Sequence, residues 1–442
     1  MIITSTFTYE VILLLSSMII LGLFVGRWFE HFNIPNISGY ITLGILFGGL
    51  LVYLGYTELN NVFMVITTIA IGFIAFIIGM ELDFAKIANR RKEVIIITFF
   101  QAMFTSIITA VILWVFGLPL HIALILGTIA IATEPGPILL ITKKFKTKGP
   151  LTETLVPLHG VEDMISIVLF GLAIAYAYAV ESQTPLTVFG LLNGPVFELL
   201  FSVGIGVIIG LIFRQIIYLT LYEDPDKDTI VMVTTTVAVL VAIAIAQRGI
   251  HLFGLHIHLS PILLPMVVGI TFANLSTSKA KHEIEHDVDV FTAPLMIAFF
   301  TVIGAEVVIL MTQDQLPLGL WLIILYTVLY IGFRVLGKLL GSSVGAVVAK
   351  SEPNISKYLG LCLIPQAQAA IGLAFLAQAK LKDYGDYGQL ILVVVLIASI
   401  IYELFGPWGL KYALIQCDEA DSQVCSIMDA QVYKRRQKKH KN

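Results

Sequence analysis

Two acidic residues stand side by side near the start of a long apolar stretch, "LHGVEDMISIVLFGLAIAYAYAV", which runs from residue 158 to 180. On a helix, four polar residues of this stretch share one face because they are spaced i, i+3, i+4 and i+7: His159, Glu162, Asp163 and Ser166. A carboxylate at the centre of a bilayer costs about 2.5–3.5 kcal/mol on insertion scales. Two neighbouring carboxylates with little water around them cannot easily both carry charge. The pair can therefore hold either a proton or a small cation, which is what exchanging one for the other requires.

A simpler interpretation places Glu162 and Asp163 at the start of a helix, where they would only interact with its dipole. The apolar run extends back through "LTETLVPL", however, and this favours a buried position for both acids. A lone histidine near the end of a span is more often structural, so we expect a structural role for His159.

Two basic residues lie in another apolar stretch, "LYIGFRVLGKLLGSSVG", where Arg334 and Lys338 are spaced i, i+4 on one face. Basic residues close to the end of a span can extend towards the interface. Apolar residues flank this pair on both sides, so we expect it to pair with buried carboxylates instead. Lys338, unlike Arg334, can lose its proton when buried and so take part in the exchange.

Two apolar segments are interrupted near their middles. The first, "IALILGTIAIATEPGPILLI", contains Thr133, Glu134, Pro135, Gly136 and Pro137 where a helix would otherwise continue. Proline removes a backbone donor and clashes with the preceding turn, so the helix is predicted to unwind there.

The second interrupted segment is "YLGLCLIPQAQAAIGLAFLA", where Pro365 and Gly372 bracket Gln366 and Gln368. Backbone groups without partners are tolerated at membrane depth only inside protein or beside a wet cavity. For either break alone, a simple proline kink is an alternative. A pair of interrupted segments in corresponding halves of the chain indicates a transporter with inverted repeats.

The composition sets the class of protein. Of the 442 residues, 58% are hydrophobic and only 13% are charged, whereas soluble domains carry about 25% charged residues. Apolar runs of about 20 residues recur along the chain, which is the pattern of transmembrane helices. We predict an all-α polytopic membrane protein with about 13 transmembrane helices, at residues 9–29, 37–55, 62–80, 94–116, 120–142, 151–180, 194–220, 229–247, 259–275, 290–311, 317–348, 356–379 and 387–411.

The joints between these segments alternate in basic content. Joints such as "KIANRRKE" and "KKFKTKGP", with the tail "KRRQKKHK", fall on one side, and "TELNN" and "ESQTP", which lack Lys and Arg, fall on the other. The positive-inside rule then predicts an external N-terminus and a cytoplasmic C-terminus. No C-x-x-C, H-E-x-x-H, Walker or G-x-G-x-x-G pattern occurs, so we expect no enzyme, no cofactor and no nucleic-acid partner.

Seven stretches follow one another in an order that carries a family resemblance: "IPNISGYITLGILFG", "FIIGMELDF", "ATEPGPILL", "GVEDMISIVLFG", "HLSPILLPMVVGITFANLS", "FRVLGKLLGS" and "LIPQAQAAIGLAF". Over essentially its whole membrane part, the chain resembles bacterial monovalent cation:proton antiporters of the second cation:proton antiporter family. The resemblance implies a homodimer in the cytoplasmic (inner) membrane of a bacterium. It also implies a transmembrane antiporter domain at 1–411, with an elevator-type core around 94–180 and 317–411, a dimerisation scaffold from the remaining helices, and a short basic cytoplasmic tail at 412–442.

By the same resemblance, Asp163 is the ion-binding aspartate, Glu162 is its neighbour, and Thr133 is the polar residue of an unwound crossing. Lys338 stands where electrogenic members have a lysine that pairs with the first acid, and Arg334 where electroneutral members have an arginine. The other residues of the two breaks are Glu134, Pro135, Gly136, Pro365, Gln366 and Gln368.

The chain departs from the family pattern at the acidic pair. Electrogenic relatives usually have Asp-Asp and electroneutral ones Asn-Asp, whereas this chain has Glu162-Asp163 and both basic residues. The number of protons exchanged per cation is therefore left open.

These observations predict secondary active antiport of a monovalent cation, Na⁺ or K⁺, against H⁺, with both ions competing for Glu162 and Asp163. Two alternatives remain at this stage. In a gated cation efflux channel the acids would line a pore, and in a sodium-coupled symporter an organic solute would accompany sodium.

Overall fold

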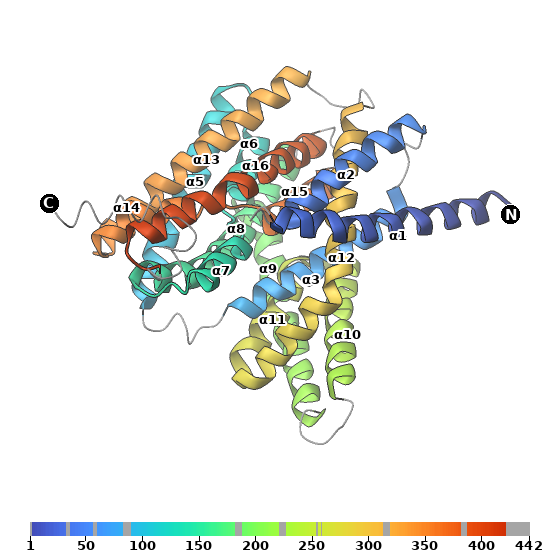
Figure 1. Ribbon diagram of the computed structural model, residues 1–442, viewed down its shortest axis with the longest axis horizontal. Coiled ribbons are helices and arrows are strands. Elements are labelled where there is room, and N and C mark those ends of the chain that lie inside the picture. Colours follow the sequence, from blue (N-terminus) through green and yellow to red (C-terminus); the bar gives the residue numbers. More distant parts are fainter. Residues whose placement is uncertain are drawn as a thin grey trace.

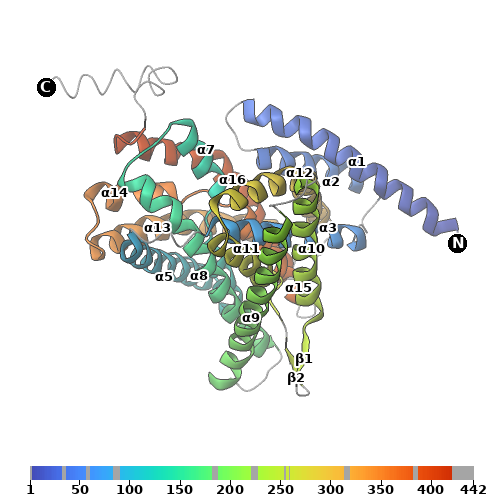
Figure 2. The ribbon, with the colours of Figure 1, turned by 90° about the horizontal axis from the view of Figure 1, so that it is seen from below.

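The computed structural model describes residues 2–31, 36–55, 60–82, 90–181, 188–220, 227–252, 255–257, 259–312, 319–381 and 387–420. Each apolar segment predicted from the sequence coincides with one helix or with two successive short helices. The described residues add one small β-hairpin, in which β1 (Ile250–Leu252) pairs with β2 (Leu255–Ile257); Figure 2 shows it beside α9 at one end of the molecule. The predicted all-α membrane fold class is confirmed.

One group of helices carries all the predicted site residues (Figure 1). Its members are α5 (Arg91–Val115), α6 (Leu120–Ile129), α7 (Pro135–Lys144), α8 (Pro150–Glu181), α13 (Leu320–Val348), α14 (Pro353–Cys362), α15 (Gln368–Leu381) and α16 (Tyr387–Gln416). The order long helix, two short helices, long helix occurs twice, in α5 to α8 and again in α13 to α16. This repetition contains the two broken helices that the sequence predicts.

A second group of helices packs beside the first. It consists of α1 (Ile2–His31), α2 (Asn36–Tyr53), α3 (Asn60–Glu81), α9 (Val188–Thr220), α10 (Lys227–Arg248), α11 (Leu263–Leu275) and α12 (Ser278–Thr312). Within it, α12 packs on α2, and α11 lies between α3 and α9. Buried side chains of α3 and α11 join those of α8 and α15 in one continuous hydrophobic core, so the two groups meet along an apolar seam.

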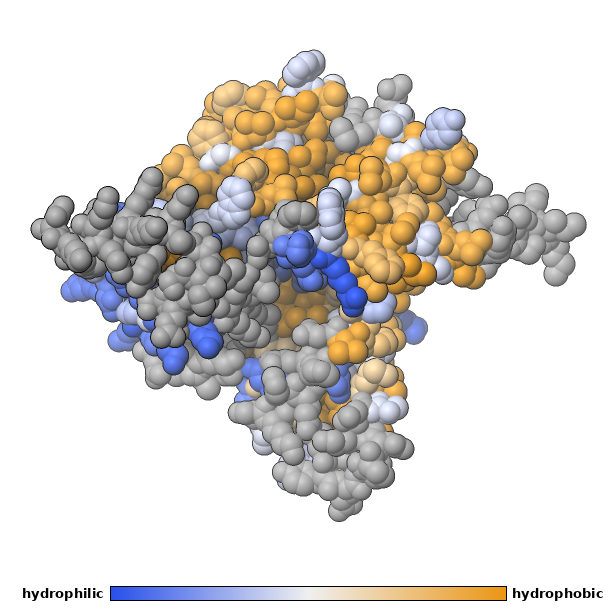
Figure 3. Space-filling model, in the orientation of Figure 1, coloured by the Kyte–Doolittle hydropathy of each residue, from blue (hydrophilic) through white to orange (hydrophobic). Residues whose placement is uncertain are grey.

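The surface is that of a membrane protein. Nine of the described helices are long and apolar enough to cross a bilayer. Figure 3 shows hydrophobic side chains covering much of the face over α13, α16 and α2. The exposed hydrophobic residues of these three helices include Trp321, Val328, Phe405, Trp408 and Leu46. Other apolar helices, such as α6 and α11, are shorter than a full span, so the count of about 13 spans stays a prediction.

Small residues allow α5 and α13 to lie in backbone contact. A Cβ atom placed on Gly337, Gly341 or Gly345 would come within 2.6–2.8 Å of a Cα atom of α5. Such close approach through regularly spaced small residues is the usual means of helix association inside a membrane. It fixes the height at which α13 presents Arg334 and Lys338, because both residues lie just before or within this glycine series.

Candidate ion-binding site

The two broken helices cross where their backbones unwind. The Glu134 amide donates to the carbonyl of Pro365 at 3.0 Å, and the Gln366 side-chain amide donates to the carbonyl of Ile129 at 2.9 Å. Gln366 is also within 3.1 Å of the hydroxyl of Tyr330 on α13. These bonds satisfy part of the backbone that proline and glycine release from helical hydrogen bonding.

Each broken helix consists of two half-helices, α6 and α7 in the first and α14 and α15 in the second. Arg334 lies at the carboxyl ends of α6 and α14. Its guanidinium is fully buried and donates to three main-chain carbonyls, those of Ala130 at 2.9 Å, Ala132 at 2.8 Å and Ile364 at 2.7 Å. The ring of Tyr402 lies 4.5 Å below it. The sequence led us to expect a buried carboxylate as the partner of Arg334, whereas its partners here are carbonyls. The physical reason is that unpaired carbonyls at helix ends carry partial negative charge.

Glu134 lies at the opposite, amino ends of the two other half-helices. Its carboxylate accepts from the Gln368 amide at 2.8 Å and from the Gly136 amide at 3.4 Å. Pro135, the first residue of α7, has no amide to satisfy, which suits this position. One buried carboxylate thus faces the amino ends of α7 and α15 together, where the helix dipoles favour negative charge.

Lys338 and Glu162 form a fully buried ion pair. The Lys338 ammonium lies 3.1 and 3.2 Å from the two oxygens of the Glu162 carboxylate. It also donates to the Thr133 hydroxyl at 2.7 Å and to the carbonyl of Ile131, and the Thr133 hydroxyl in turn donates to Glu162 at 2.5 Å. The site thus brings together Glu162, Thr133 and Lys338, from α8, the first break and α13.

Asp163 has no such partners. Its side chain is 1% exposed, yet neither carboxylate oxygen has a hydrogen-bond partner among the described residues. The charged groups close enough to interact with it are His159, Glu162, Glu134 and Lys338. Charges of both signs thus act on a buried carboxylate whose oxygens have no hydrogen-bond partner among the described residues.

Asp163 opens onto a small cavity at the seam between the two helix groups. Side chains of α3 line one wall, residues of α15 line another, and Ser166 lies one turn further along α8. The Ser166 hydroxyl is turned away, since it donates to the carbonyl of Thr128 at 2.8 Å. The Ser166 hydroxyl is therefore not a partner of the Asp163 carboxylate.

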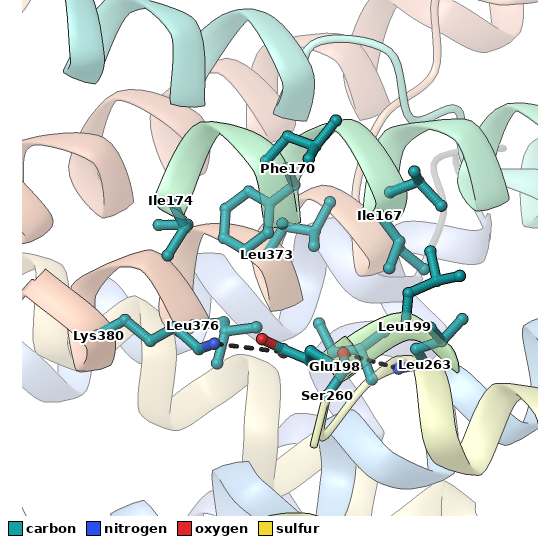
Figure 4. A pocket seen from close by; sticks show the side chains of 14 residues that line it. Ile167, Phe170, Ile174, Glu198, Leu199, Ser260, Leu263, Leu373, Leu376 and Lys380 are labelled. Carbon is teal, nitrogen blue, oxygen red and sulfur yellow. Dashed lines mark hydrogen bonds and ion pairs between the residues drawn. The ribbon is translucent and has the colours of Figure 1, made fainter. Parts of the chain in front are cut away.

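A larger apolar cavity of about 180 Å³ lies further along the same seam. It is bounded by α8 and α15 on one side and by α9 and the start of α11 on the other. Figure 4 shows Lys380 of α15 pointing to Glu198 of α9, at a distance of 3.4 Å. This ion pair links the two helix groups across a boundary that is otherwise mostly apolar.

Sequence reasoning missed Glu403 on α16. This residue is fully buried, and neither of its carboxylate oxygens has a partner in the part of the chain that the structure describes. The signal was a single acid inside the run "VVVLIASIIYELFGPWGL", which lies close enough to the predicted end of its segment to pass for an interfacial residue.

Comparisons with known proteins agree with this architecture. A family model described as the transmembrane sodium/hydrogen exchanger matches residues 16–409. The chain therefore belongs to the sodium/hydrogen exchanger family, whose members are secondary active cation:proton antiporters.

Two particular proteins are similar over nearly their whole length. The ammonium/H⁺ antiporter subunit AmhT of Alkalihalophilus pseudofirmus is 24% identical over 417 residues, which is 92% of this chain and 94% of that protein. The solved sodium proton antiporter MjNhaP1 of Methanocaldococcus jannaschii, at pH 8, superposes with a TM-score of 0.73 at 16% identity, covering 92% of this chain and 99% of that one. The latter likeness establishes a shared fold.

Proposed function

We propose that this chain exchanges a monovalent cation for protons at Asp163, which is exposed alternately to the two sides of the membrane. One observation carries the proposal: Asp163 is buried while neither of its carboxylate oxygens has a hydrogen-bond partner in the described part of the chain. A buried carboxylate cannot stay charged without compensation. It must hold either a proton or a cation, and competition between the two couples their movements.

Glu162 has a different role in this proposal. Its charge is compensated by Lys338 and by the Thr133 hydroxyl, so it stays in place as part of the site while Asp163 changes ligand. An arriving cation would compete with the Lys338 ammonium for the negative charge of the pair. If Lys338 then releases its proton, a second proton moves in each cycle; if it does not, one proton moves per cation.

The geometry also supports the proposed division into a mobile core and a scaffold. The core is α5 to α8 with α13 to α16, and the scaffold is α1 to α3 with α9 to α12. Asp163 lies at the seam between them, which is mostly apolar and therefore allows sliding. A homodimer in a bacterial inner membrane, with the N-terminus outside and the C-terminus in the cytoplasm, completes the proposal.

The cation is Na⁺, K⁺ or NH₄⁺. The first two come from the residues of the site, and the third from the similarity to AmhT, an ammonium/H⁺ antiporter subunit. All three are monovalent and fit an oxygen site with one free carboxylate.

The test is proton flux in proteoliposomes that contain the purified protein and a pH dye. Each cation is added outside in turn, with protein-free liposomes as the blank for ammonia permeation. We expect one or more of the cations to drive proton movement in the wild type and none in Asp163→Asn. A matched control is Glu181→Gln, an acid-to-amide change on the same helix at a residue whose carboxylate lies 2.9 Å from His121. If Asp163→Asn exchanges cations for protons at the wild-type rate, Asp163 is not the exchange site. Cation flux without opposing proton flux would favour a channel.

A further inference from the structure

Glu403 is a buried acid that the exchange site does not use. It lies on α16, fully removed from solvent, and its two carboxylate oxygens have no hydrogen-bond partner among the described residues. Ser399, one turn earlier on the same face, is also fully buried, with a hydroxyl that has no described partner. Two polar side chains one turn apart on α16 are thus buried without a hydrogen-bond partner among the described residues.

The packing of α16 brings Glu403 to the crossing. Gly406, one turn later, touches the second break so closely that a Cβ atom there would lie 2.8 Å from Cγ of Pro365. The carbonyl of Pro365 accepts the Glu134 amide. Glu403 and Glu134 interact electrostatically, and Glu134 is the one charged group that acts on Glu403 from the packed helices described here.

The basic residues of the neighbouring α13 are occupied elsewhere. Arg334 uses its guanidinium on three carbonyls, and Lys338 uses its ammonium on Glu162 and its neighbours. Neither basic residue donates a described hydrogen bond to Glu403. The negative charge of Glu134, by contrast, is stabilised by the amino ends of two helices.

Among the described residues, no donor forms a hydrogen bond to the Glu403 carboxylate. Pro407 adds to this shortage, because it has no amide to donate to the carbonyl of residue 403, four positions earlier. Two adjacent negative charges in a dry interior would be costly. A proton on Glu403 removes one charge and supplies the missing donor.

We propose that Glu403 is a second proton-binding site, separate from Asp163, and that it takes up and releases its proton as the crossing changes conformation during transport. The inference rests on the proposed antiport function. Proton uptake forms one O–H bond on a Glu403 oxygen with a proton from the aqueous phase, and release breaks that bond again. Rearrangement of the half-helix ends around Glu134 changes the charge that Glu403 meets, which links its protonation to the transport cycle.

Infrared difference spectroscopy on the full-length protein in liposomes tests this proposal. The spectrum is recorded between acidic and alkaline pH, in the region of the protonated carboxyl stretch. We expect a band that is lost in Glu403→Gln and retained in Asp163→Asn. The matched control is Glu306→Gln, an acid-to-amide change at a residue whose carboxylate accepts from Gln378 at 3.4 Å. That control should keep the band. If Glu403→Gln keeps every band of the wild type, the proposal is overturned.

Transport measurements separate this proposal from the function on which it rests. Glu403→Gln resembles the protonated form, so it should fold with an unchanged Tm. Its exchange rate should fall about tenfold, and the pH profile of exchange should become less steep. Wild-type rate and profile would make Glu403 a permanently protonated structural residue and end the proposal. If Glu403→Gln does not fold, Glu403→Asp should shift the midpoint of the profile, and an unshifted midpoint counts against it. Exchange by Asp163→Asn would instead overturn the antiport site itself.

Discussion

Glu162 and Asp163 are neighbours on α8, but their side chains lie in contrasting surroundings. Glu162 faces the crossing, where an ammonium and a hydroxyl hold its carboxylate. Asp163 faces the seam, where its oxygens have no described partner. Both side chains are buried to the same degree, at 0% and 1% exposure. Burial alone therefore does not distinguish a structural acid from one that changes ligand; the number of donors around it does.

The contrast has a physical consequence for transport. An acid with full compensation resists both protonation and cation binding, because either event must displace an existing bond. An acid without compensation accepts whichever ligand arrives. In the proposed function, adjacent positions on one helix provide both properties: the Glu162–Lys338 pair keeps the crossing in place while Asp163 exchanges its ligand.

The largest expected effect tests the free side of this comparison. Asp163→Asn should abolish the thermal stabilisation that the transported cation gives, and should lower exchange by roughly 100-fold or more. A ligand that binds only the folded state raises its Tm by mass action, and the amide removes the charge on which that binding depends. Thermal unfolding with and without the cation measures the change. Undiminished stabilisation would place the cation elsewhere.

The next prediction tests the fixed side. Lys338→Ala should destabilise the fold by about 3–5 kcal/mol, because it leaves the Glu162 charge buried with one hydroxyl donor. The double variant Lys338→Ala with Glu162→Gln should recover most of that loss, since no unpaired charge remains. Unfolding in detergent of the two single variants and the double variant completes the cycle. Additive losses would show that the pair is not coupled.

A smaller loss is expected at the carboxyl ends of the half-helices. Arg334→Lys keeps the charge but cannot reach three carbonyls with one planar group, so we expect a cost of about 1–3 kcal/mol. Exchange should persist at a reduced rate, because Asp163 is untouched. Tm and flux measured on the same preparation test both parts. A complete loss of exchange with an unchanged Tm would give Arg334 a direct part in ion binding.

The smallest effect on stability is expected at the seam. Glu198→Gln breaks the pair with Lys380, and each side chain retains about a quarter of its exposure. The cost in stability should therefore stay below about 1 kcal/mol. If the two helix groups slide past each other, loss of this link should change the exchange rate more than the Tm. A large fall in Tm with an unchanged rate would argue against sliding at this boundary.

Much of the fold follows from the sequence, because length and apolar content determine where helices can cross a bilayer. The two breaks follow as well, since proline inside an apolar run leaves few other choices. The partners of the polar residues do not follow. Arg334 and Lys338 are both basic and lie on the same face of α13, yet Arg334 contacts carbonyls and Lys338 contacts a carboxylate. Lys338 lies one helical turn further along α13, where the neighbour is α8 and no longer the ends of the half-helices.

The acids show the same limit. The spacing of Glu162 and Asp163 predicts an ion site, but the difference between their surroundings depends on helices far away in sequence. Glu134 could be named as part of a break, whereas its position at two helix amino ends depends on the crossing itself. No neighbouring polar residue in the sequence marks Glu403 as part of a site. Its buried position beside the second break follows only from the packing of α16.

The glycine contact between α5 and α13 has a mechanical consequence. α13 has 29 residues, so at 1.5 Å per residue it is about 43 Å long, more than the thickness of the hydrocarbon core. Because the two backbones approach each other at three successive glycines, there is little room for one helix to slide along the other, and the pair resists shear. If the core slides as proposed, this pair transmits a displacement at one face of the membrane to the other face, together with the ion at Asp163.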